Sequence, residues 1–304
     1  MGHYILVDAN SVGYTNHCSA SLSYMGKPVQ AIYGFVNTML MLRQQYPSGK
    51  IIVLWDNRAH WRYEMLPEYK SSRHSKAKPE QVAMREAYKA QIPDIKEALR
   101  LMGVCQLSAH DYEADDLAGW LSQRYSHSGH TVTLFTGDYD WIQLVNENVT
   151  WRSVGREEKV IRLANFEKMT GFKSTRQFLD AKAMIGDKSD CIDGLKGLGK
   201  VRVGKILEEF GTAEHWYQTA FAGMYEPKTK TFADACSREG YELYKRNICL
   251  MSLIDIKAPP KESVTLVSEP YDEEGLTEFF ASHGFVSLVR DIATFNHNFR
   301  KNHD

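Results

Sequence analysis

Short apolar runs alternate with stretches of helical periodicity in the first half of the chain. Four runs predict buried strands, at residues 4–7, 51–55, 104–107 and 131–135. Residues 28–46, 80–101 and 117–125 place apolar side chains three and four positions apart, as helices do, and Pro93 is expected to kink or divide the second of these helices. Strands that alternate with helices predict an α/β fold with a mostly parallel central sheet and flanking helices.

The pattern changes in the second half of the chain. Residues 149–151 and 159–163 are weaker strand candidates at a sheet edge, and a short helix is expected through residues 141–144. Helices at 177–185 and 200–210 flank a glycine-rich connector at 186–199. We therefore expect a core domain at 1–170 and a small helical domain at 171–255. Residues 256–304 contain an extended stretch at 263–267 and helices near 276–280 and 286–292, and we expect them to pack back on the core.

Residues 61–100 interrupt the strand and helix order with a polar, basic stretch. Between Glu68 and Lys89 there are six Lys or Arg residues and three Glu residues. A charge run of this kind is usually a solvated loop and helix face. Because it follows a strand that ends in an acid, the alternative is a cationic flap over a polyanion.

Composition sets limits on the class of protein. With 304 residues and 43% hydrophobic content, the chain can bury a large core, which excludes a disordered or fibrous protein. A net charge of −1 does not by itself indicate a nucleic-acid partner. Five scattered cysteines argue against a disulfide framework, and there is neither a bilayer-spanning run nor a signal-peptide pattern. We expect a soluble, cytoplasmic protein that does not bind membranes.

Acidic residues follow the predicted strands. Asp8 and Asp56 end the first two strands, and two tight clusters lie at or near later helix starts, namely Glu113, Asp115 and Asp116, then Asp138 and Asp140. Any one of these acids alone is better explained as a helix or loop cap. Parallel topology would bring all of them to one edge of the sheet, where crowded like charges need cations between them. The sequence therefore predicts a site for two hard divalent cations, Mg²⁺ or Mn²⁺.

Two such ions can activate a water molecule and stabilise a phosphate under attack, so the predicted chemistry is phosphoester hydrolysis. Cysteines and histidines are not arranged to favour zinc. A basic side chain would stabilise charge that develops on the phosphate, and Lys70 and Arg73 are the best placed by sequence.

The connector contains Gly194-Leu195-Lys196-Gly197-Leu198-Gly199, followed by a helix from Lys200. Gly197 and Gly199 allow a tight turn whose amides, at a helix N-terminus, could bind a DNA phosphate. The basic side chains of Lys196, Lys200, Arg202 and Lys205 would add attraction that does not depend on base sequence. A simple turn between two helices explains the glycines equally well.

Together these residues resemble the flap endonuclease and 5′–3′ exonuclease family of the 5′-nuclease superfamily, in the free-standing bacteriophage form and in the 5′-nuclease domain of bacterial DNA polymerase I. The resemblance covers most of residues 1–255. It rests on six motifs in the family's order: Val7-Asp8-Ala9-Asn10, Trp55-Asp56, the stretch from Leu66 to Arg73, Tyr112-Glu113-Ala114-Asp115-Asp116, Thr136-Gly137-Asp138-Tyr139-Asp140, and Gly186-Asp187-Lys188-Ser189-Asp190 with its glycine turn.

The resemblance implies a core like that of PIN and resolvase domains, a helical arch at about 61–100 and a helix–three-turn–helix element at 171–255. One metal position would be served by Asp8, Asp56, Glu113 and Asp115, with Asp116 nearby, and a second by Asp138, Asp140, Asp187 and Asp190. Lys70 and Arg73 match basic residues at the foot of the arch, where Lys76 and Lys78 are expected to contact DNA. The glycine turn would grip duplex DNA and bind K⁺ through backbone carbonyls. The chain departs from the family at Val201, where Lys is common.

The function expected from this resemblance is a Mg²⁺-dependent 5′ nuclease of replication or repair. It would be a monomer in a bacterial or phage-infected cell and would act on DNA with a 5′ flap, nick or 5′ end, and on RNA–DNA hybrids. A PIN-type ribonuclease would keep the acids but lack the glycine hairpin and basic arch. A non-catalytic DNA-binding module would keep the hairpin and lose acids.

Overall fold

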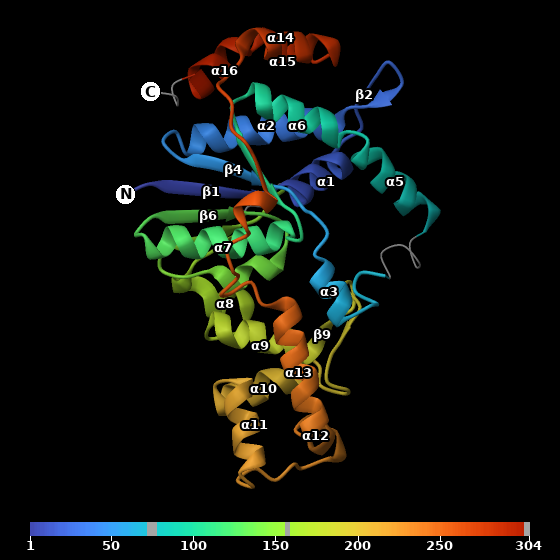
Figure 1. The fold of residues 1–304 in the computed structure, drawn as a ribbon, viewed down its shortest axis with the longest axis vertical. Coiled ribbons are helices and arrows are strands. Elements are labelled where there is room, and N and C mark those ends of the chain that lie inside the picture. The colour runs from blue at the N-terminus through green and yellow to red at the C-terminus, as the bar shows by residue number, and fades with distance from the viewer. Residues whose placement is uncertain (72–77, 156–158, 301–304) are drawn as a thin grey trace.

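Five parallel strands form the centre of a seven-stranded sheet in the computed structural model, which describes residues 1–71, 78–155 and 159–300. The order across the sheet is β11-β5-β4-β1-β6-β7-β8 (Figure 1). The strands are β1 (His3–Asp8), β4 (Lys50–Leu54), β5 (Cys105–Ala109), β6 (Thr131–Phe135), β7 (Val149–Arg152), β8 (Val160–Ile161) and β11 (Val264–Val267). Both edge strands, β8 and β11, run antiparallel to their neighbours. The predicted mostly parallel sheet is confirmed.

Helices cover both faces of this sheet. Successive side chains of a strand point to opposite faces, so Ile5 and Val7 pack into one buried cluster with helices α1 (Ala9–Ser19), α2 (Gln30–Gln45) and α6 (Ile92–Leu101). Leu6 packs on the other face against α7 (Ala114–His127). Burial on both faces explains why the strands are continuous apolar runs. The result is a three-layer α/β arrangement with flanking helices (Figure 1).

The stretch predicted as one helix at 80–101 is two helices. Helix α5 (Pro79–Lys89) ends before Ala90, and α6 begins at Ile92, with Pro93 in its first turn. Proline is tolerated there because its missing N–H has no helical partner. Residues 72–77, which the structure does not describe, come between α3 (His60–Met65) and α5 in the sequence. The predicted site residues Arg73 and Lys76 belong to this segment.

Helix α1 has no apolar periodicity in the sequence and was not predicted. Asp8 caps it, because a carboxylate oxygen accepts a hydrogen bond from the Ser11 N–H (2.9 Å). The helix then packs against α2 and α5. At Gly13 a Cβ atom would lie 2.5 Å from the Tyr88 hydroxyl of α5, so this approach requires glycine. Tertiary contacts therefore stabilise a helix whose Asn, Ser, Gly and Thr residues do not favour one. A short hairpin of β2 (Ser23–Tyr24) and β3 (Lys27–Pro28) follows it.

A helical region continues from the end of the sheet. It comprises the 3₁₀ helix η2 (Leu163–Asn165), followed by α8 (Phe166–Thr170), α9 (Thr175–Ile185), the two-residue strands β9 (Gly186–Asp187) and β10 (Ile192–Asp193), α10 (Lys200–Phe210), α11 (Ala213–Phe221), α12 (Lys230–Ala235) and α13 (Arg238–Met251). Another 3₁₀ helix, η1 (Tyr139–Leu144), lies between β6 and β7. Met184 of α9 and Val203 of α10 belong to the same buried cluster as Leu6 and α7. The helical region therefore shares a core with one face of the sheet.

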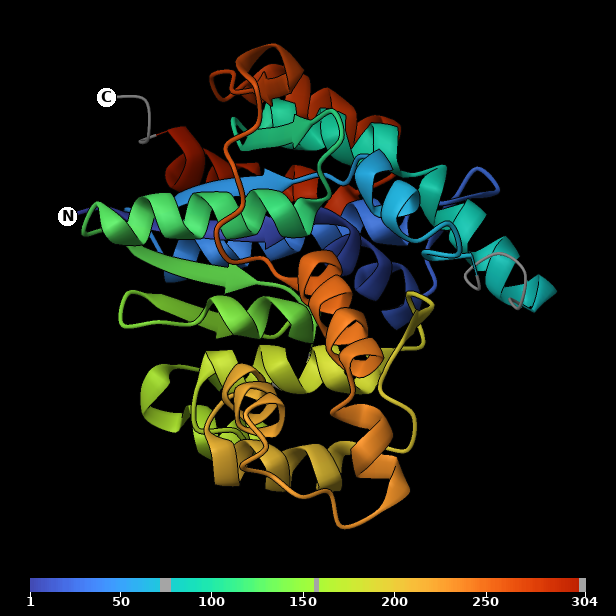
Figure 2. The ribbon, with the colours of Figure 1, turned by 60° about the horizontal axis from the view of Figure 1, so that its bottom comes forward.

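After α13 the chain crosses back over the core, as Figure 2 shows. A Cβ atom at Gly119 of α7 would lie 2.2 Å from the Leu253 carbonyl oxygen, so only glycine permits this crossing. The Gln143 side chain donates to the Met251 carbonyl (3.1 Å) and accepts from the Leu253 N–H (2.9 Å). The end of α13 is thus fastened to the core by buried contacts.

The C-terminal residues return to the sheet. The 3₁₀ helix η3 (Lys261–Ser263) leads into β11, which pairs with β5. Helices α14 (Glu273–Ser282), α15 (Val286–Arg290) and α16 (Ile292–Phe299) follow, and α14 and α16 contact α6 and α2 respectively. Across residues 1–71, 78–155 and 159–300, no helix has the length and apolar character needed to cross a bilayer.

Candidate functional site

Carboxylates gather where the central parallel strands end. Asp8 ends β1 and pairs in register with Leu54, while Val7 pairs with Phe135 of β6, so the three central strands end at the same level. Asp56 and Asp138 follow β4 and β6, and Glu113 caps the start of α7. A carboxylate oxygen of Asp56 accepts a hydrogen bond from the Ala114 N–H (2.7 Å), which joins the end of β4 to α7. The sheet edge therefore brings together acids from separate parts of the sequence.

Burial and mutual repulsion act on these acids. Burial raises the pKa of Asp8 to about 7, and the nearby Asp56 and Asp138 add to the rise. Burial also raises the pKa of Asp115 well above its usual range, and the charges of Asp138, Asp56 and Glu113 raise it further. Such shifts mean that the protein's own positive charges do not neutralise this edge. A cation bound there would lower both pKa values.

Hydrogen bonds fix the direction of the carboxylates. The Thr136 hydroxyl donates to Asp8 (2.8 Å) and accepts from the Asp138 N–H (2.9 Å), so one side chain orients two acids. The indole N–H of Trp141, which is fully buried, donates to Asp115 (2.7 Å). Each bond leaves the other lone pairs of its acid available for a further ligand.

A second group of acids lies beside the first. A hollow is lined by the carboxylates Asp115, Asp140, Asp187 and Asp190, together with Arg62 and Tyr69. Lys182 of α9 donates to Asp140, and its Nζ lies 3.6 Å from Asp187 Oδ2. Burial would raise the pKa of Asp187, but hydrogen bonds from Ser189 and the charge of Lys182 hold it below its usual value. Asp187 and Asp190, from the helical region, thus reach the sheet edge.

Asp116 differs from the other acids in the sequence cluster because Arg62 binds its carboxylate, and its place at the metal site stays a prediction. Its Oδ1 and Oδ2 accept hydrogen bonds from both terminal nitrogens of Arg62 (2.6 and 2.8 Å), and Oδ2 also accepts the Glu113 N–H (2.9 Å). Arg62 and Asp116 are 2% and 1% exposed, so this ion pair is sealed from water. Asp116 therefore positions Arg62 and the start of α7, and of its two carboxylate oxygens only Oδ1 keeps a lone pair outside these bonds.

Lys70 lies at the mouth of the site. Its Nζ is 2.5 Å from Glu113 Oε1, and Tyr69 donates to the other oxygen of Glu113 (3.0 Å). The backbone of Lys70 has φ +57°, a conformation that is strained for a residue other than glycine, and its N–H donates to the Asp190 carbonyl (3.0 Å). Strain held by specific contacts keeps this lysine beside the acids.

The predicted DNA-binding lysines and arginine that the structure describes lie on the surface. Lys78 is exposed, and its N–H donates to Gln81 at the start of α5 (3.1 Å). At the glycine turn Gly197 has φ +79°, Gly199 caps α10, and Arg202 donates to the Gly197 carbonyl (2.7 Å). The exposed side chains at this end of α10 include Lys196, Lys200 and Arg202, with Val201 75% exposed between the last two.

Four positioning residues were missed by sequence reasoning: Arg62, Thr136, Trp141 and Lys182. Thr136 and Trp141 adjoin the Asp138 motif, so their nearness to acids was the available signal. Arg62 appeared to belong to the solvated basic stretch, and Lys182 to the polar face of a helix. Neither has a spacing that indicates a buried or half-buried ion pair.

The donor set is chemically suited to a hard cation, since it consists of carboxylate oxygens without thiolates or imidazoles. Within the described residues, however, no three Asp, Glu, His or Cys side chains are arranged to hold an ion. Lys70 contacts Glu113, and Lys182 contacts Asp140 and Asp187, so an ammonium already accompanies three of these acids.

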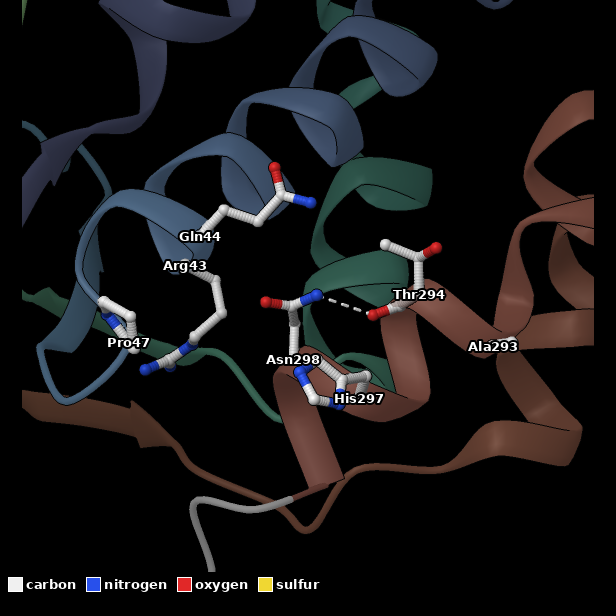
Figure 3. A pocket seen from close by; sticks show the side chains of 7 residues that line it. All are labelled: Arg43, Gln44, Pro47, Ala293, Thr294, His297 and Asn298. Carbon is white, nitrogen blue, oxygen red and sulfur yellow. Dashed lines mark hydrogen bonds between the residues drawn. The ribbon is translucent and has the colours of Figure 1, made fainter.

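A larger hollow lies at the opposite edge of the sheet, where the chain enters β4. Figure 3 shows it between the end of α2 and α16. Its lining includes Arg43, Gln44, His297 and Asn298 and contains no carboxylate. It therefore does not belong to the acidic site.

Comparisons with known proteins agree with this fold. A family model described as the 5′-3′ exonuclease, N-terminal resolvase-like domain, matches residues 3–171. The 5′-3′ exonuclease of Aquifex aeolicus is 30% identical over 238 residues, which cover 76% of this chain and 75% of that protein. The thermostable DNA polymerase I of Thermus thermophilus is 30% identical over 297 residues, which cover 96% of this chain. The chain spans 22–33% of the length of the DNA polymerase I relatives that it matches.

A solved structure shares the whole fold. The bacteriophage T5 flap endonuclease, in a complex with DNA and metal ions, superposes with a TM-score of 0.70 and 23% identity. The superposition covers 97% of this chain and 99% of that one.

Proposed function

The chain belongs to the 5′–3′ exonuclease family, and from that premise we propose that it is a metal-dependent, structure-specific 5′ nuclease that hydrolyses DNA phosphodiesters. Its proposed substrates carry a 5′ flap, a nick or a 5′ end. The observation that carries the proposal is the set of carboxylates at the edge of the sheet where β1, β4 and β6 end and α7 begins. Most of them are buried or half-buried, and Asp56 is exposed. The raised pKa values of Asp8 and Asp115 mark a place where positive charge is missing.

Two groups of acids would hold Mg²⁺ or Mn²⁺. One group is Asp8, Asp56, Glu113 and Asp115, and the other is Asp138, Asp140, Asp187 and Asp190. Divalent ions at these positions supply an activated water and neutralise charge on the phosphate. The chain's own residues do the rest: Thr136 and Trp141 orient their acids, and Lys70 contributes a positive charge where the phosphate would lie.

The proposed DNA contacts lie on two elements. The exposed basic residues Lys196, Lys200 and Arg202 surround the turn of Gly197 and Gly199, whose shape suits a DNA backbone and a K⁺ ion bound by carbonyls. On the arch, Lys78 is exposed beside α5, and Arg73 and Lys76 are proposed partners within 72–77. We divide the chain into a core at 1–170, a DNA-gripping region at 171–255 and a returning segment at 256–304. It would act as a cytoplasmic monomer in replication or repair, where RNA–DNA hybrids are further substrates.

The test is product mapping on 5′-flap, nicked and blunt DNA with Mg²⁺, using wild type and Asp138→Asn. We expect wild type to release 5′-phosphate products, and the variant to lose cleavage while keeping DNA affinity. Lys168→Gln, which alters an exposed side chain on α8, serves as the control. Unchanged flap cleavage by Asp138→Asn would refute the metal assignment.

A further inference from the structure

Lys182 lies where the second group of acids would bind a cation. It is on the last turn of α9, five residues before Asp187, and its ammonium donates to Asp140 and lies 3.6 Å from Asp187 Oδ2. The three side chains are 21–27% exposed, so the contact is half-buried and is screened less than a surface ion pair. A divalent ion at the second position would need the same two carboxylates.

The ammonium and a divalent ion cannot both remain there. Each would lie within a few ångströms of the same oxygens, and their mutual repulsion is strong at that separation. The lysine side chain has a flexible four-carbon stem and a compact charge, so it can leave without any backbone change.

We infer that Lys182 is a built-in counter-ion that occupies the second cation position in the metal-free protein and is displaced when a divalent ion binds. The inference rests on the proposed function, because it concerns the same pair of metal positions. It assigns the lysine a positioning role: it weakens binding of the second ion and fills the space beside Asp140 and Asp187 until that ion arrives.

The test is a Mn²⁺ titration of the full chain by calorimetry, without DNA, so that the readout does not depend on cleavage. In Lys182→Gln the dissociation constant of the second ion should fall about tenfold, since one opposing charge is removed. Lys182→Arg keeps the charge and should retain the wild-type constant within about threefold. Lys168→Gln removes an equal charge from an exposed side chain on α8, outside the motifs of the acidic site, and should change nothing. Asp187→Asn, which removes a ligand of the second position, identifies the step in the isotherm that belongs to it.

Two failures can be told apart. If wild type binds two Mn²⁺ ions and Lys182→Gln binds the second no more tightly, the inference is wrong and the proposed function stands. If none of these proteins binds Mn²⁺, the two-metal function itself is refuted, and the inference with it.

Discussion

Replacing Arg62 with Met is expected to lower the free energy of unfolding by about 3–5 kcal/mol. The Arg62 guanidinium makes two hydrogen bonds to Asp116 (2.6 and 2.8 Å), donates to the Leu250 carbonyl (3.1 Å) and lies 3.2 Å from Glu113. Asp116 and Glu113 are 1% and 5% exposed. Methionine fills a similar volume but leaves the buried Asp116 without its cation, and the cost of that unpaired charge dominates. Glu113 keeps its contact with Lys70.

The assay is urea-induced unfolding in EDTA, followed by fluorescence and circular dichroism. Arg100→Met is the matched control, because Arg100 also binds a carboxylate, Glu97, through two nitrogens (2.7 and 2.8 Å) but is 34% exposed in its side chain. An exposed pair contributes about 0–1 kcal/mol, so this control should stay near wild type. Arg62→Met with Asp116→Leu removes both buried charges and should recover most of the loss. A cost at Arg62 no larger than at Arg100 would refute the reasoning.

Three further predictions concern the acidic edge. Burial and the neighbouring acids raise the pKa of Asp8 from 3.8 to about 7, so the folded, metal-free protein holds a proton that the unfolded chain releases, and its free energy of unfolding should fall as pH rises from about 4 to 7. Asp8→Asn should flatten this pH dependence, measured by urea unfolding in EDTA, and an unchanged dependence of the unfolding free energy on pH would count against the shift. Thr136→Val removes the hydroxyl that hydrogen-bonds to Asp8 and to the Asp138 N–H and should lower Mn²⁺ affinity about 10–100-fold, whereas Thr136→Ser should keep the wild-type affinity. Equal Mn²⁺ affinities in wild type and Thr136→Val would show that this hydroxyl does not position the metal ligands. Lys70→Ala should slow flap hydrolysis far more than it weakens DNA binding, and an equal loss in both measurements would mean that Lys70 only holds DNA.

The strands of the sheet could be predicted from the sequence because burial on both faces makes them continuous apolar runs. The parallel order then implied that Asp8, Asp56 and the Asp138 motif reach one edge, and the structure brings them there. Helix α1 could not be predicted, because its contacts with α2 and Tyr88, which form only in the fold, stabilise it.

Adjacent acids show a second limit of sequence reasoning. Asp115 and Asp116 stand together in the sequence, but consecutive residues of a helix differ in direction by about 100°. Asp115 therefore reaches Trp141 and the acidic hollow, whereas Asp116 turns back to Arg62. Lys182 was missed for a related reason, since the direction of a lysine on a helix depends on how α9 packs, and its five-residue distance from Asp187 carries no signal.

The crossing of the chain after α13 has a consequence for where a substrate would be cut. Gly119, Gln143 and Arg62 hold residues 250–253 against the core through buried contacts, so the helical region has no free hinge at this joint. The glycine turn and the acids would then keep a constant separation along any bound duplex. A protein built in this way should cut at the same number of nucleotides from the end of the duplex, whatever the length of the single strand beyond it.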